Sequence, residues 1–446
     1  MPLYLGLDVG TSAVRAIVVD QQRQLRGQSR VSLPAASESD DHRGGLEQNP
    51  DIWWQACQQA LQNLAPQLRL RDIARICVDA TSATTLMCDQ QGQPLTPALM
   101  YNDSRAREQA RQIATLAPHG HVCANPSSAL AKAMWLYQHL TPDRQRDCLI
   151  QHQADWITGK FTGQFGYSDY NNCLKLGYDP QHADWPSWMD DLRLPWRLFP
   201  RVMQPGDEIA DIDGQIAANL RLSPDCRIVA GTTDSTASIV AAGDLQIGDA
   251  VTTLGSTLVL KILSGTAINH AQNGVYSHFY FGRYLVGGAS NSGGAVLRHY
   301  FSQAEIERLS ASIDAEQDYD LDYYPLLRPG ERFPIADPSL PPRLLPRPPQ
   351  DSEFLHALMT GIAKIEKLGY DQLQKLGAPY PKRVITMGGG ANSEVWRRIR
   401  ERILGVPVQN LAFCESAMGA ALLAMSAPLI DHKTKTADSN QLENKS

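Results

Sequence analysis

The sequence predicts an α/β protein of two domains with a ligand cleft between them. At 446 residues it is longer than one compact core usually supports, and two domains of roughly 200 residues each are expected. Four short turns that contain glycine follow apolar runs with strand character. Each turn offers backbone N–H groups that suit a bound anion. Because ligands favour the clefts between domains, we expect the four turns to share one site.

The first turn joins two apolar runs at the N-terminus. Apolar side chains alternate along residues 3–9 and again along 13–19, which indicates two neighbouring strands. Between them, glycine lets the backbone of residues 10–12 come close to a ligand. The N–H groups and two hydroxyls of this turn can bind phosphate, and Asp8 beside it can hold a hydrated cation. For this turn alone, an ordinary β-hairpin is an equally good interpretation.

Three further turns repeat this composition later in the chain. They are Gly-Thr-Thr-Asp at 231–234, Gly-Ser-Thr at 255–257 and Gly-Gly-Gly-Ala-Asn at 388–392. Each comes directly after an apolar, strand-like run. The repetition favours phosphate and magnesium chemistry over four unrelated hairpins.

Strand and helix patterns alternate along the rest of the chain, as an α/β fold requires. Dense prolines at 324–349 exclude a regular helix or a central strand there. From 431 to 446 the chain is polar without a hydrophobic period, which predicts a disordered tail. The other predicted elements are a third strand after a turn at 20–27, a helix at 52–64 capped by Asn49 or Asp51, strands at 73–78 and 227–230, and helices at 125–140, 235–242, 352–376 and from 415 onward.

Two polar segments, at 79–82 and 101–105, follow predicted strand ends in the first half of the chain. Ligands bind beyond the carboxyl ends of strands in open α/β sheets, so these segments are candidates for a substrate pocket. The alternative is that Asp79 and Asp103 only cap the helices that follow them.

Composition and charge argue against several kinds of partner. The net charge is −6 and no long run of Lys and Arg occurs, so nucleic acid is not expected to bind. The eight cysteines include no C-x-x-C pair, which argues against a zinc site and a disulfide framework. Neither a bilayer-spanning apolar stretch nor a signal peptide pattern is present. We therefore expect a cytoplasmic protein with no membrane partner. Neither a P-loop nor a Rossmann fingerprint occurs in the sequence.

The four turns, in this order, resemble those of the FGGY family of carbohydrate kinases, within the actin, hexokinase and heat-shock-chaperone ATPase superfamily. The resemblance extends from about residue 3 to about residue 427. It implies two RNase H-like domains of the actin-like ATPase type, which we place at residues 1–229 for the sugar side and 230–430 for the nucleotide side. It also implies that the last helix packs back on the first domain.

The resemblance implies transfer of the γ-phosphate of ATP to a sugar hydroxyl with Mg²⁺ as the metal. Asp234 stands at the position of the catalytic base, and the helix after it would direct its dipole at the phosphates. Asp8 and Asp234 would hold the metal. The implied ATP and phosphate contacts are Gly10, Thr11, Ser12, Gly231, Thr232, Gly255, Ser256 and Thr257, with Gly389, Gly390 and Asn392 at the adenosine, and the implied sugar contacts are Asp8, Ser82, Asp103 and Asp234.

Departures from the family pattern bear on the substrates. Ser82 stands where xylulose kinases often have His, so we expect D-ribulose as the sugar, with D-xylulose or a polyol as the alternative. Arg398 and Glu401-Arg402 lie where relatives often have Gln-x-x-Ala-Asp, which leaves the nucleotide preference open. Lys132 and Asp169 match family patterns but could equally be a helix surface residue and a turn former.

Sugar and ATP are thus the expected partners, for a monomer or a homodimer. A hypothesis of another class is a nucleotide-dependent regulatory or binding protein that turns over no sugar. Retention of Asp234 argues against it, because a binding role does not need that acid.

Overall fold

A computed structural model describes residues 1–38, 45–317, 319, 321–410 and 415–426 of the chain. The N-terminal alternation forms a hairpin of β1 (Leu3–Val9) and β2 (Ala13–Val19), as predicted. The antiparallel register places Asp8 opposite Arg15 and Val9 opposite Val14. The glycine-containing turn therefore projects from the end of the sheet.

The first lobe is organised around a six-stranded mixed sheet with the order β12-β13-β6-β1-β2-β3. Strands β6 and β13 run parallel to β1, so their carboxyl ends meet at one edge of the sheet. In that register Asp79 lies opposite Asp8 on one side and opposite Thr232 on the other. The added strands are β3 (Leu25–Ser32), β6 (Ile73–Ala80), β12 (Glu208–Asp211) and β13 (Arg227–Thr233).

The second lobe repeats this arrangement around a sheet with the order β16-β17-β15-β14-β18-β19. An antiparallel run of β14, β15 and β17 is followed by β18 and β19, which lie parallel to β14. The same order of five strands therefore occurs in both lobes, and the sixth strand is added at opposite edges, β12 beside β13 and β16 beside β17. The strands are β14 (Asp249–Leu254), β15 (Leu258–Ser264), β16 (Tyr276–Tyr280), β17 (Arg283–Ser290), β18 (Arg383–Met387) and β19 (Val408–Asn410).

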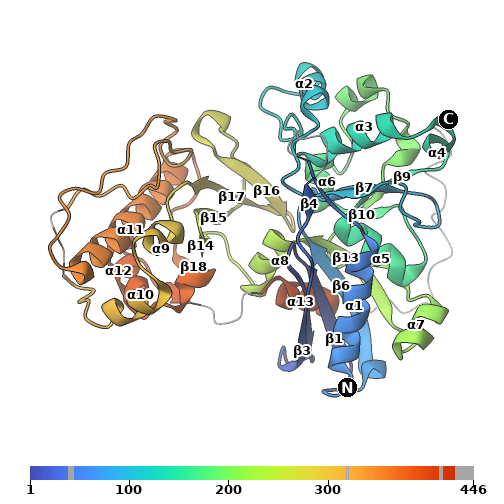
Figure 1. The fold of residues 1–446 in the computed structure, drawn as a ribbon, viewed down its shortest axis with the longest axis horizontal. Coiled ribbons are helices and arrows are strands. Elements are labelled where there is room, and N and C mark those ends of the chain that lie inside the picture. The colour runs from blue at the N-terminus through green and yellow to red at the C-terminus, as the bar shows by residue number, and fades with distance from the viewer. Residues whose placement is uncertain (39–44, 318, 320, 411–414, 427–446) are drawn as a thin grey trace.

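Each sheet is covered by helices that bury the apolar faces of its strands (Figure 1). In the first lobe, α1 (Asp51–Leu64) and α5 (Gln153–Thr162) cover one face, and the fully buried Trp53 and Trp156 anchor that core. In the second lobe, α11 (Asp351–Lys375) and α12 (Glu394–Leu404) pack on the sheet.

The last helix, α13 (Ser416–Ser426), returns to the first lobe and covers the other face of its sheet. It lies beside α8 (Asp234–Ala241), at the edge of the first lobe that faces the second (Figure 1). Two glycines make this contact possible. A Cβ on Gly6 would lie 2.0 Å from the carbonyl oxygen of Ala417, and one on Gly419 would lie 1.7 Å from that of Ala237. Only glycine fits at either position.

The remaining elements extend the two lobes. A five-stranded sheet with α2 and α3 adds a further layer to the first lobe, and α9 and α10 belong to the second (Figure 1). Their bounds are β4 (Ser37–Glu38), β5 (Leu46–Gln48), β7 (Thr85–Cys88), β8 (Ala98–Leu99), β9 (Leu149–His152), β10 (Tyr167–Asp169), β11 (Arg201–Met203), α2 (Arg107–Leu116), α3 (Ala129–His139), α4 (Pro142–Arg146), α6 (Tyr170–Cys173), α7 (Gly214–Leu220), α9 (Gly294–Tyr300) and α10 (Gln303–Ser310). Short 3₁₀ helices include Leu174–Leu176 and Gly389–Asn392.

Several boundaries differ from the predicted ones. A division between residues 229 and 230 falls inside β13, which is one continuous strand of the first sheet. The helix predicted from 125 begins at Ala129, because Ser128 caps it through a hydrogen bond from the N–H of Ala131. The N-cap of α1 is Pro50, without a side-chain cap, and neither Asn49 nor Asp51 takes that place.

Two predictions concern segments without regular elements. Within the described part of 324–349 no helix or strand element forms, as the proline content predicts. The predicted tail at 431–446 lies outside the described residues. No helix in the described part of the chain combines the length and apolar character that crossing a bilayer needs.

Candidate active site

A cavity of about 480 Å³ lies beyond the carboxyl ends of β1, β6 and β13. The parallel pairing of these strands is what brings segments that are distant in the sequence to one place. Six of the residues implied as ligands line it together with five others. The lining is Asp8, Gly10, Thr11, Ser12, Arg15, Thr81, Ser82, Tyr101, Lys175, Asp234 and Ser416.

The turn between β1 and β2 presents its backbone and hydroxyls to this cavity. The N–H of Gly10 donates to the carbonyl of Ala13 at 3.1 Å, which closes the turn. Thr11 and Ser12 are exposed at its tip, and the carbonyl of Ser12 is held by the N–H of Leu33 at 2.8 Å. The turn is thus fixed, with polar groups directed at the cavity and suited to an anion.

Asp8 and Asp79 form a pair of acids beneath the turn. Arg15 Nη1 donates to Asp8 Oδ2 at 3.0 Å, yet burial outweighs this cation and raises the pKa of Asp8. Burial, together with the charge of Asp8, raises the pKa of Asp79 well above its ordinary value. Neither carboxylate oxygen of Asp79 has a hydrogen-bond partner among the described residues. Asp79 is fully buried beside Asp8, and a divalent cation at this place would favour the ionised forms of both acids.

The described residues contain no group of three or more His, Cys, Asp or Glu side chains placed to hold a metal. A cation at Asp8 would therefore complete its coordination with water or phosphate oxygens, which is the usual manner of Mg²⁺.

Asp234 is the first residue of α8 and faces the same cavity. Its carboxylate accepts a hydrogen bond from the N–H of Ser235 at 2.6 Å. Burial raises the pKa of Asp234 to about 6, with a smaller contribution from Asp8, while the Ser235 N–H and the charge of Lys175 oppose this rise. A carboxylate with such a pKa is mostly ionised at neutral pH and can accept a proton.

Lys132 supports the cavity wall and does not line it. Its ammonium donates to the carbonyl oxygens of Ala83 and, at 2.8 Å, of Met100. These carbonyls directly follow Ser82 and precede Tyr101, so the lysine ties the two wall segments together. Burial lowers its pKa to about 7.

Three residues implied as ligands lie away from the cavity, which corrects their expected roles. The carboxylate of Asp103 accepts from the N–H of Leu46 at 2.8 Å and pairs with Arg105 at 2.8 Å, so it holds the chain around the wall. Thr232 is fully buried, and its hydroxyl accepts from the side chain of Asn171 at 2.9 Å. Gly231 is pressed against β6, where a Cβ would lie 1.8 Å from the carbonyl oxygen of Val78.

Asp169 is likewise committed within the protein. It caps α6 by accepting hydrogen bonds from the N–H groups of Asn171 and Asn172, at 2.8 and 3.1 Å. This is the turn-forming role that the sequence left open.

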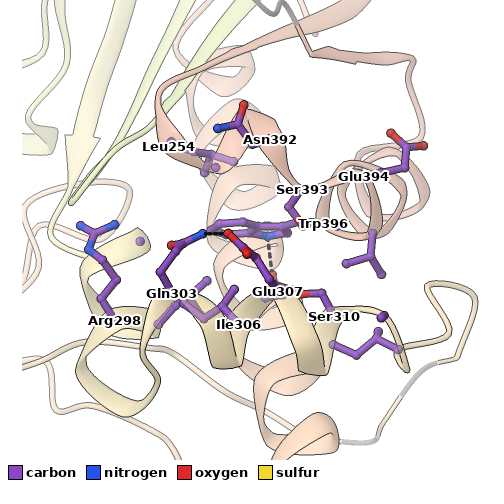
Figure 2. A pocket seen from close by; sticks show the side chains of 18 of the residues that line it. Leu254, Arg298, Gln303, Ile306, Glu307, Ser310, Asn392, Ser393, Glu394 and Trp396 are labelled. Atoms are coloured by element: carbon purple, nitrogen blue, oxygen red, sulfur yellow. Dashed lines mark hydrogen bonds between the residues drawn. The ribbon is translucent and has the colours of Figure 1, made fainter.

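A second cavity, of about 520 Å³, lies in the second lobe. Gly389, Gly390 and Asn392, the residues expected at the adenosine, line it. Trp396 and side chains of α10 line it as well (Figure 2). Trp396 is held in place because its indole N–H donates to the carbonyl of Met359 at 3.2 Å. Within α10, which lines the cavity, the side-chain amide of Gln303 donates to the carboxylate of Glu307 at 2.8 Å (Figure 2).

The turn at 255–257 borders this second cavity. The N–H groups of Gly294 and Ala295, at the start of α9, donate to the carbonyls of Gly255 and Ser256 at 2.9 and 3.1 Å. Arg298, which lines the cavity, donates to the hydroxyl of Ser256 at 2.9 Å. The guanidinium therefore links the cavity to a turn suited to phosphate.

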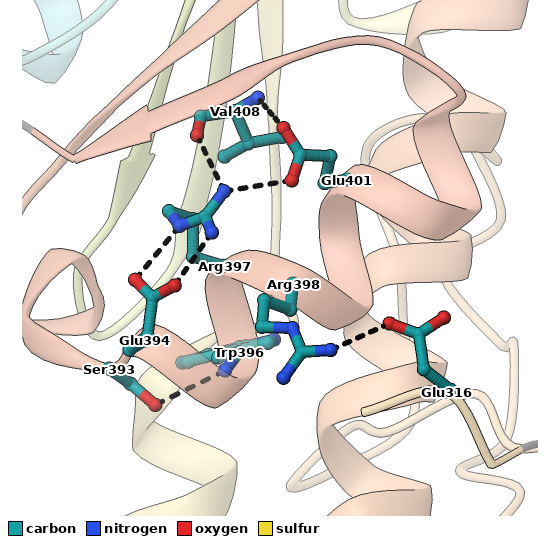
Figure 3. Close-up of polar contacts among 8 residues, drawn as sticks. All are labelled: Glu316, Ser393, Glu394, Trp396, Arg397, Arg398, Glu401 and Val408. Carbon is teal, nitrogen blue, oxygen red and sulfur yellow. Dashed lines mark hydrogen bonds and ion pairs between the residues drawn. The ribbon is translucent and has the colours of Figure 1, made fainter. Parts of the chain in front are cut away.

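The arginines of α12 at and beside the family departure have polar partners, some on α12 and some elsewhere in the second lobe. Figure 3 shows the contacts of Arg397 and Arg398. Arg397 bridges Glu394 and Glu401, at 2.6 and 2.8 Å, and also donates to the carbonyl of Val408. Arg398 borders the cavity and pairs with Glu316 at 3.0 Å. The guanidinium of Arg402 donates to the carbonyl of Ala315 at 3.1 Å. These contacts fix the helix that carries Trp396.

The implied ligands other than Asp103, Gly231 and Thr232 thus form two groups, one in each lobe. Sequence reasoning did not find Arg15, Lys175 or Ser416 in the first group, nor Arg298 in the second. The hairpin register alone would have placed Arg15 opposite Asp8. The other three come from distant segments and have no local pattern that marks them.

Two family models match the chain. The N-terminal domain of the FGGY family of carbohydrate kinases matches residues 3–241, and its C-terminal domain matches residues 250–427. The xylulose kinase of Staphylococcus epidermidis is 25% identical over 442 residues, covering 95% of this chain and 87% of its own. That of Escherichia coli K12 is 25% identical over 448 residues, covering 95% and 90%.

Solved structures share the fold. A ligand-bound xylulose kinase from Lactobacillus acidophilus superposes with a TM-score of 0.80 at 18% identity, covering 95% of this chain and 89% of its own. A gluconate kinase from the same species gives a TM-score of 0.79 at 20% identity, covering 95% and 88%.

Proposed function

Because the chain belongs to the FGGY family of carbohydrate kinases, over residues 3–241 and 250–427, it is an ATP-dependent sugar kinase, and we propose that its sugar is a five-carbon ketose. The observation that carries the proposal is that Asp8, Thr11 and Asp234 line one cavity although they are far apart in the chain. Positioning and neutralisation of charge are what phosphoryl transfer chiefly needs, and this cavity offers groups for both.

The first candidate for the sugar is D-xylulose. Both curated relatives described above carry the name xylulose kinase, and this supports the alternative expectation over the first one, D-ribulose. D-Ribulose remains the second candidate because Ser82, and not His, lines the cavity. At 25% identity, side chains of the pocket can differ between relatives.

We assign the general base to Asp234. Its carboxylate faces the cavity and, with a pKa of about 6, is ionised at neutral pH. It would take the proton of the sugar hydroxyl as that oxygen attacks the γ-phosphorus. Asp234 is half-buried and lines the cavity, so closure of the lobes around the substrates would keep bulk water from competing for this proton.

The phosphates would lie between the two lobes. The turn at 10–12, in the first lobe, and the turn at 255–257, in the second, each carry backbone N–H groups and hydroxyls that would contact the phosphates. Asp8 would hold Mg²⁺, with Asp79 behind it, and the ion would neutralise charge on the phosphate oxygens when bound. The cavity with Gly389, Gly390 and Trp396 would take the adenosine.

A screen that couples ADP release to a colour change tests the proposal. D-Xylulose, D-ribulose, gluconate, glycerol and erythritol would be compared with ATP and Mg²⁺ present. We expect a pentulose to give the highest kcat/KM by at least about tenfold, because a pocket built for specific hydroxyls rejects shorter or oxidised analogues.

The screen also addresses the function of another class. If no sugar or polyol stimulates ADP release while a protein partner changes ATP hydrolysis, the chain acts as a nucleotide-dependent regulator. We propose that the protein works in the cytoplasm, as a monomer or homodimer, with sugar and ATP as its partners.

A further inference from the structure

One cation of the first cavity is left available to a ligand. The charged side chains of the lining are Asp8, Arg15, Lys175 and Asp234. Arg15 pairs with Asp8 at 3.0 Å, so its charge is used within that pair. Lys175 is half-buried and makes no hydrogen bond or ion pair with any residue that the structure describes, Asp234 included. The ammonium of Lys175 and the carboxylate of Asp234 can therefore contact one ligand in the same cavity.

The backbone that carries Lys175 is fixed within the first lobe. The lysine lies in the 3₁₀ helix Leu174–Leu176, which follows α6 directly. The carbonyl of Leu174 accepts hydrogen bonds from the N–H of Gly177 at 3.4 Å and from the thiol of Cys123 at 3.6 Å. The side chain thus extends toward the cavity from a rigid base, and a charge held in this way needs little reorganisation to act on a ligand.

A buried hydrogen bond ties the same segment to the strand that leads to the general base. The side-chain amide of Asn171, in α6, donates to the hydroxyl of Thr232 in β13 at 2.9 Å. Both residues are buried, and Thr232 lies two positions before Asp234 in the chain. The segments that carry Lys175 and Asp234 therefore keep a fixed relation to one another at the wall of the cavity.

The segment also begins at a contact between the lobes. Tyr170 is the first residue of α6, and its hydroxyl accepts a hydrogen bond from the N–H of Phe281 at 3.3 Å. Its ring lies 5.2 Å from the ring of Phe279, between ring centres. Both phenylalanines belong to the second lobe, in β16 and in the turn that follows it. The segment of Lys175 thus touches both lobes, as would the phosphates of a nucleotide held between them.

We propose that Lys175 is a catalytic residue whose ammonium binds the γ-phosphoryl group of ATP while that group is transferred to the sugar. The inference rests on the proposed function and adds a residue to the same site. In the transfer, a bond forms between the sugar oxygen and the γ-phosphorus as the bond from this phosphorus to the bridging oxygen breaks. The hydroxyl proton passes to Asp234, and the electron pair of the broken bond leaves with ADP. Lys175 keeps its proton and neutralises negative charge on the phosphoryl oxygens.

A phosphoryl group suits this ammonium better than an uncharged sugar does. The triphosphate adds negative charge to a cavity that already holds the carboxylates of Asp8 and Asp234. Because Arg15 is paired with Asp8, Lys175 is the lining cation that remains for the incoming charge. Hydrogen bonds between ionised groups are roughly twice as strong as those between neutral groups, so a phosphate oxygen gains more from the ammonium than a hydroxyl would.

Steady-state kinetics with D-xylulose and MgATP test the assignment. The variants are Lys175→Met and Lys175→Arg, with Lys364→Met, at an exposed lysine of α11, as the matched control. We expect kcat of Lys175→Met to fall by about 10²- to 10³-fold, as for the loss of one preorganised group that stabilises the transition state. KM for both substrates should stay close to that of the wild type, because the interaction is strongest during transfer. Lys175→Arg keeps the charge and should recover part of the loss.

A trapped complex gives a second measurement that needs no turnover. MgADP, aluminium fluoride and D-xylulose together imitate the phosphoryl group in transfer, and calorimetry measures the affinity of the protein for them. We expect Lys175→Met to weaken this complex by about 10²-fold or more, since analogues of a transition state report the interactions made there. MgADP alone and D-xylulose alone should bind to the variant as they do to the wild type. A lysine that only supports the fold would not change the first affinity while leaving the other two intact.

Two results overturn the inference. One is a kcat of Lys175→Met close to that of the wild type, together with an unchanged affinity for the trapped complex. The other is a loss of affinity for D-xylulose alone that accounts for the whole kinetic effect, which would assign the lysine to the sugar.

Failure of the kinase proposal can be told apart from failure of this assignment. If the wild type phosphorylates no sugar, the kinase proposal falls. MgADP and aluminium fluoride without sugar then imitate transfer to water, and the same variants are compared in binding and in ATP hydrolysis. A selective loss in Lys175→Met would keep the lysine at the phosphoryl group, whereas equal affinity and equal hydrolysis in Lys175→Met and Lys364→Met would remove it.

Discussion

Asp234 combines two requirements of a general base in one side chain. It projects into the cavity from the first turn of α8, and its pKa lies close to neutral pH. Asp234→Asn keeps the size and the hydrogen bond from Ser235 but cannot take a proton. We expect kcat to fall by roughly 10² to 10⁴, with ATP affinity little changed.

Asp244→Asn provides a control at a nearby exposed carboxylate, whose side chain is 88% exposed. Steady-state kinetics and calorimetry with ATP measure the two quantities. A kcat of Asp234→Asn close to that of the wild type would refute the assignment.

The same residue predicts a pH dependence. Because burial raises the pKa of Asp234 to about 6, the base is protonated and inactive below that pH, and kcat/KM should fall as pH drops through 6. Lys175 lowers this pKa, so Lys175→Met should move the acidic limb to higher pH. Initial rates at saturating ATP across pH 5 to 8 measure the limb; a limb that stays in place in the variant would contradict the assignment.

Single site residues could be predicted from the sequence where a pattern within a few residues of them determines their position. Asp8 and the turn at 10–12 follow from alternation and turn chemistry within a few residues, and the structure places them on the cavity. Asp103 follows a strand end just as Ser82 does, but a strand end does not fix where a side chain points. The carboxylate of Asp103 instead pairs with Arg105 and accepts a hydrogen bond from the N–H of Leu46. Lys175 and Ser416 reach the cavity only through the tertiary fold.

The position of α13 depends on two residues that have no side chain. It fits between the first sheet and α8 because Gly6 and Gly419 leave room for its backbone. Gly419→Ala would bring a methyl group into the carbonyl of Ala237, and overpacking of this kind typically costs about 1 to 3 kcal/mol. We expect a lower free energy of unfolding in urea, with an unchanged circular dichroism spectrum of the folded protein.

Gly214→Ala is the matched control. It lies at the start of α7, and no atom is within 4 Å of the added Cβ. If Gly419→Ala and Gly214→Ala unfold at the same urea concentration, α13 does not pack against α8 as closely as the contact between Gly419 and Ala237 indicates. The patterns of α1, α11 and the hairpin were predictable from hydrophobic periodicity, whereas the seat of α13 follows from contacts between distant segments and was expected only through the family resemblance.

For the whole molecule, the division of the site between two lobes implies movement. The turn at 10–12 belongs to the first lobe and the turn at 255–257 to the second, and under the proposed function one triphosphate would contact both. We expect the lobes to approach one another when sugar and a non-hydrolysable ATP analogue bind together, since closure also excludes water that would otherwise accept the phosphoryl group.

Small-angle scattering measures this closure as a decrease in the radius of gyration. Each ligand alone should give a smaller decrease than the pair, and the radius of Asp8→Asn should respond less to the analogue because its contact with the metal–phosphate complex is weakened. An identical radius with and without both ligands would argue for a site that is already assembled. The two-domain α/β arrangement was predictable from chain length and repeated turns, but the relative position of the lobes depends on side-chain contacts that no local pattern reports.

The return of α13 to the first lobe has a consequence for how the polypeptide is made. Residues 416–426 cover a sheet face whose own strands are all synthesised by residue 233. While the ribosome translates the second lobe, that face, with Tyr4, Ile17 and Val229, has no native cover. A nascent chain stalled before residue 416 should therefore bind chaperones that recognise apolar surface, and release from them should coincide with emergence of the last helix from the exit tunnel.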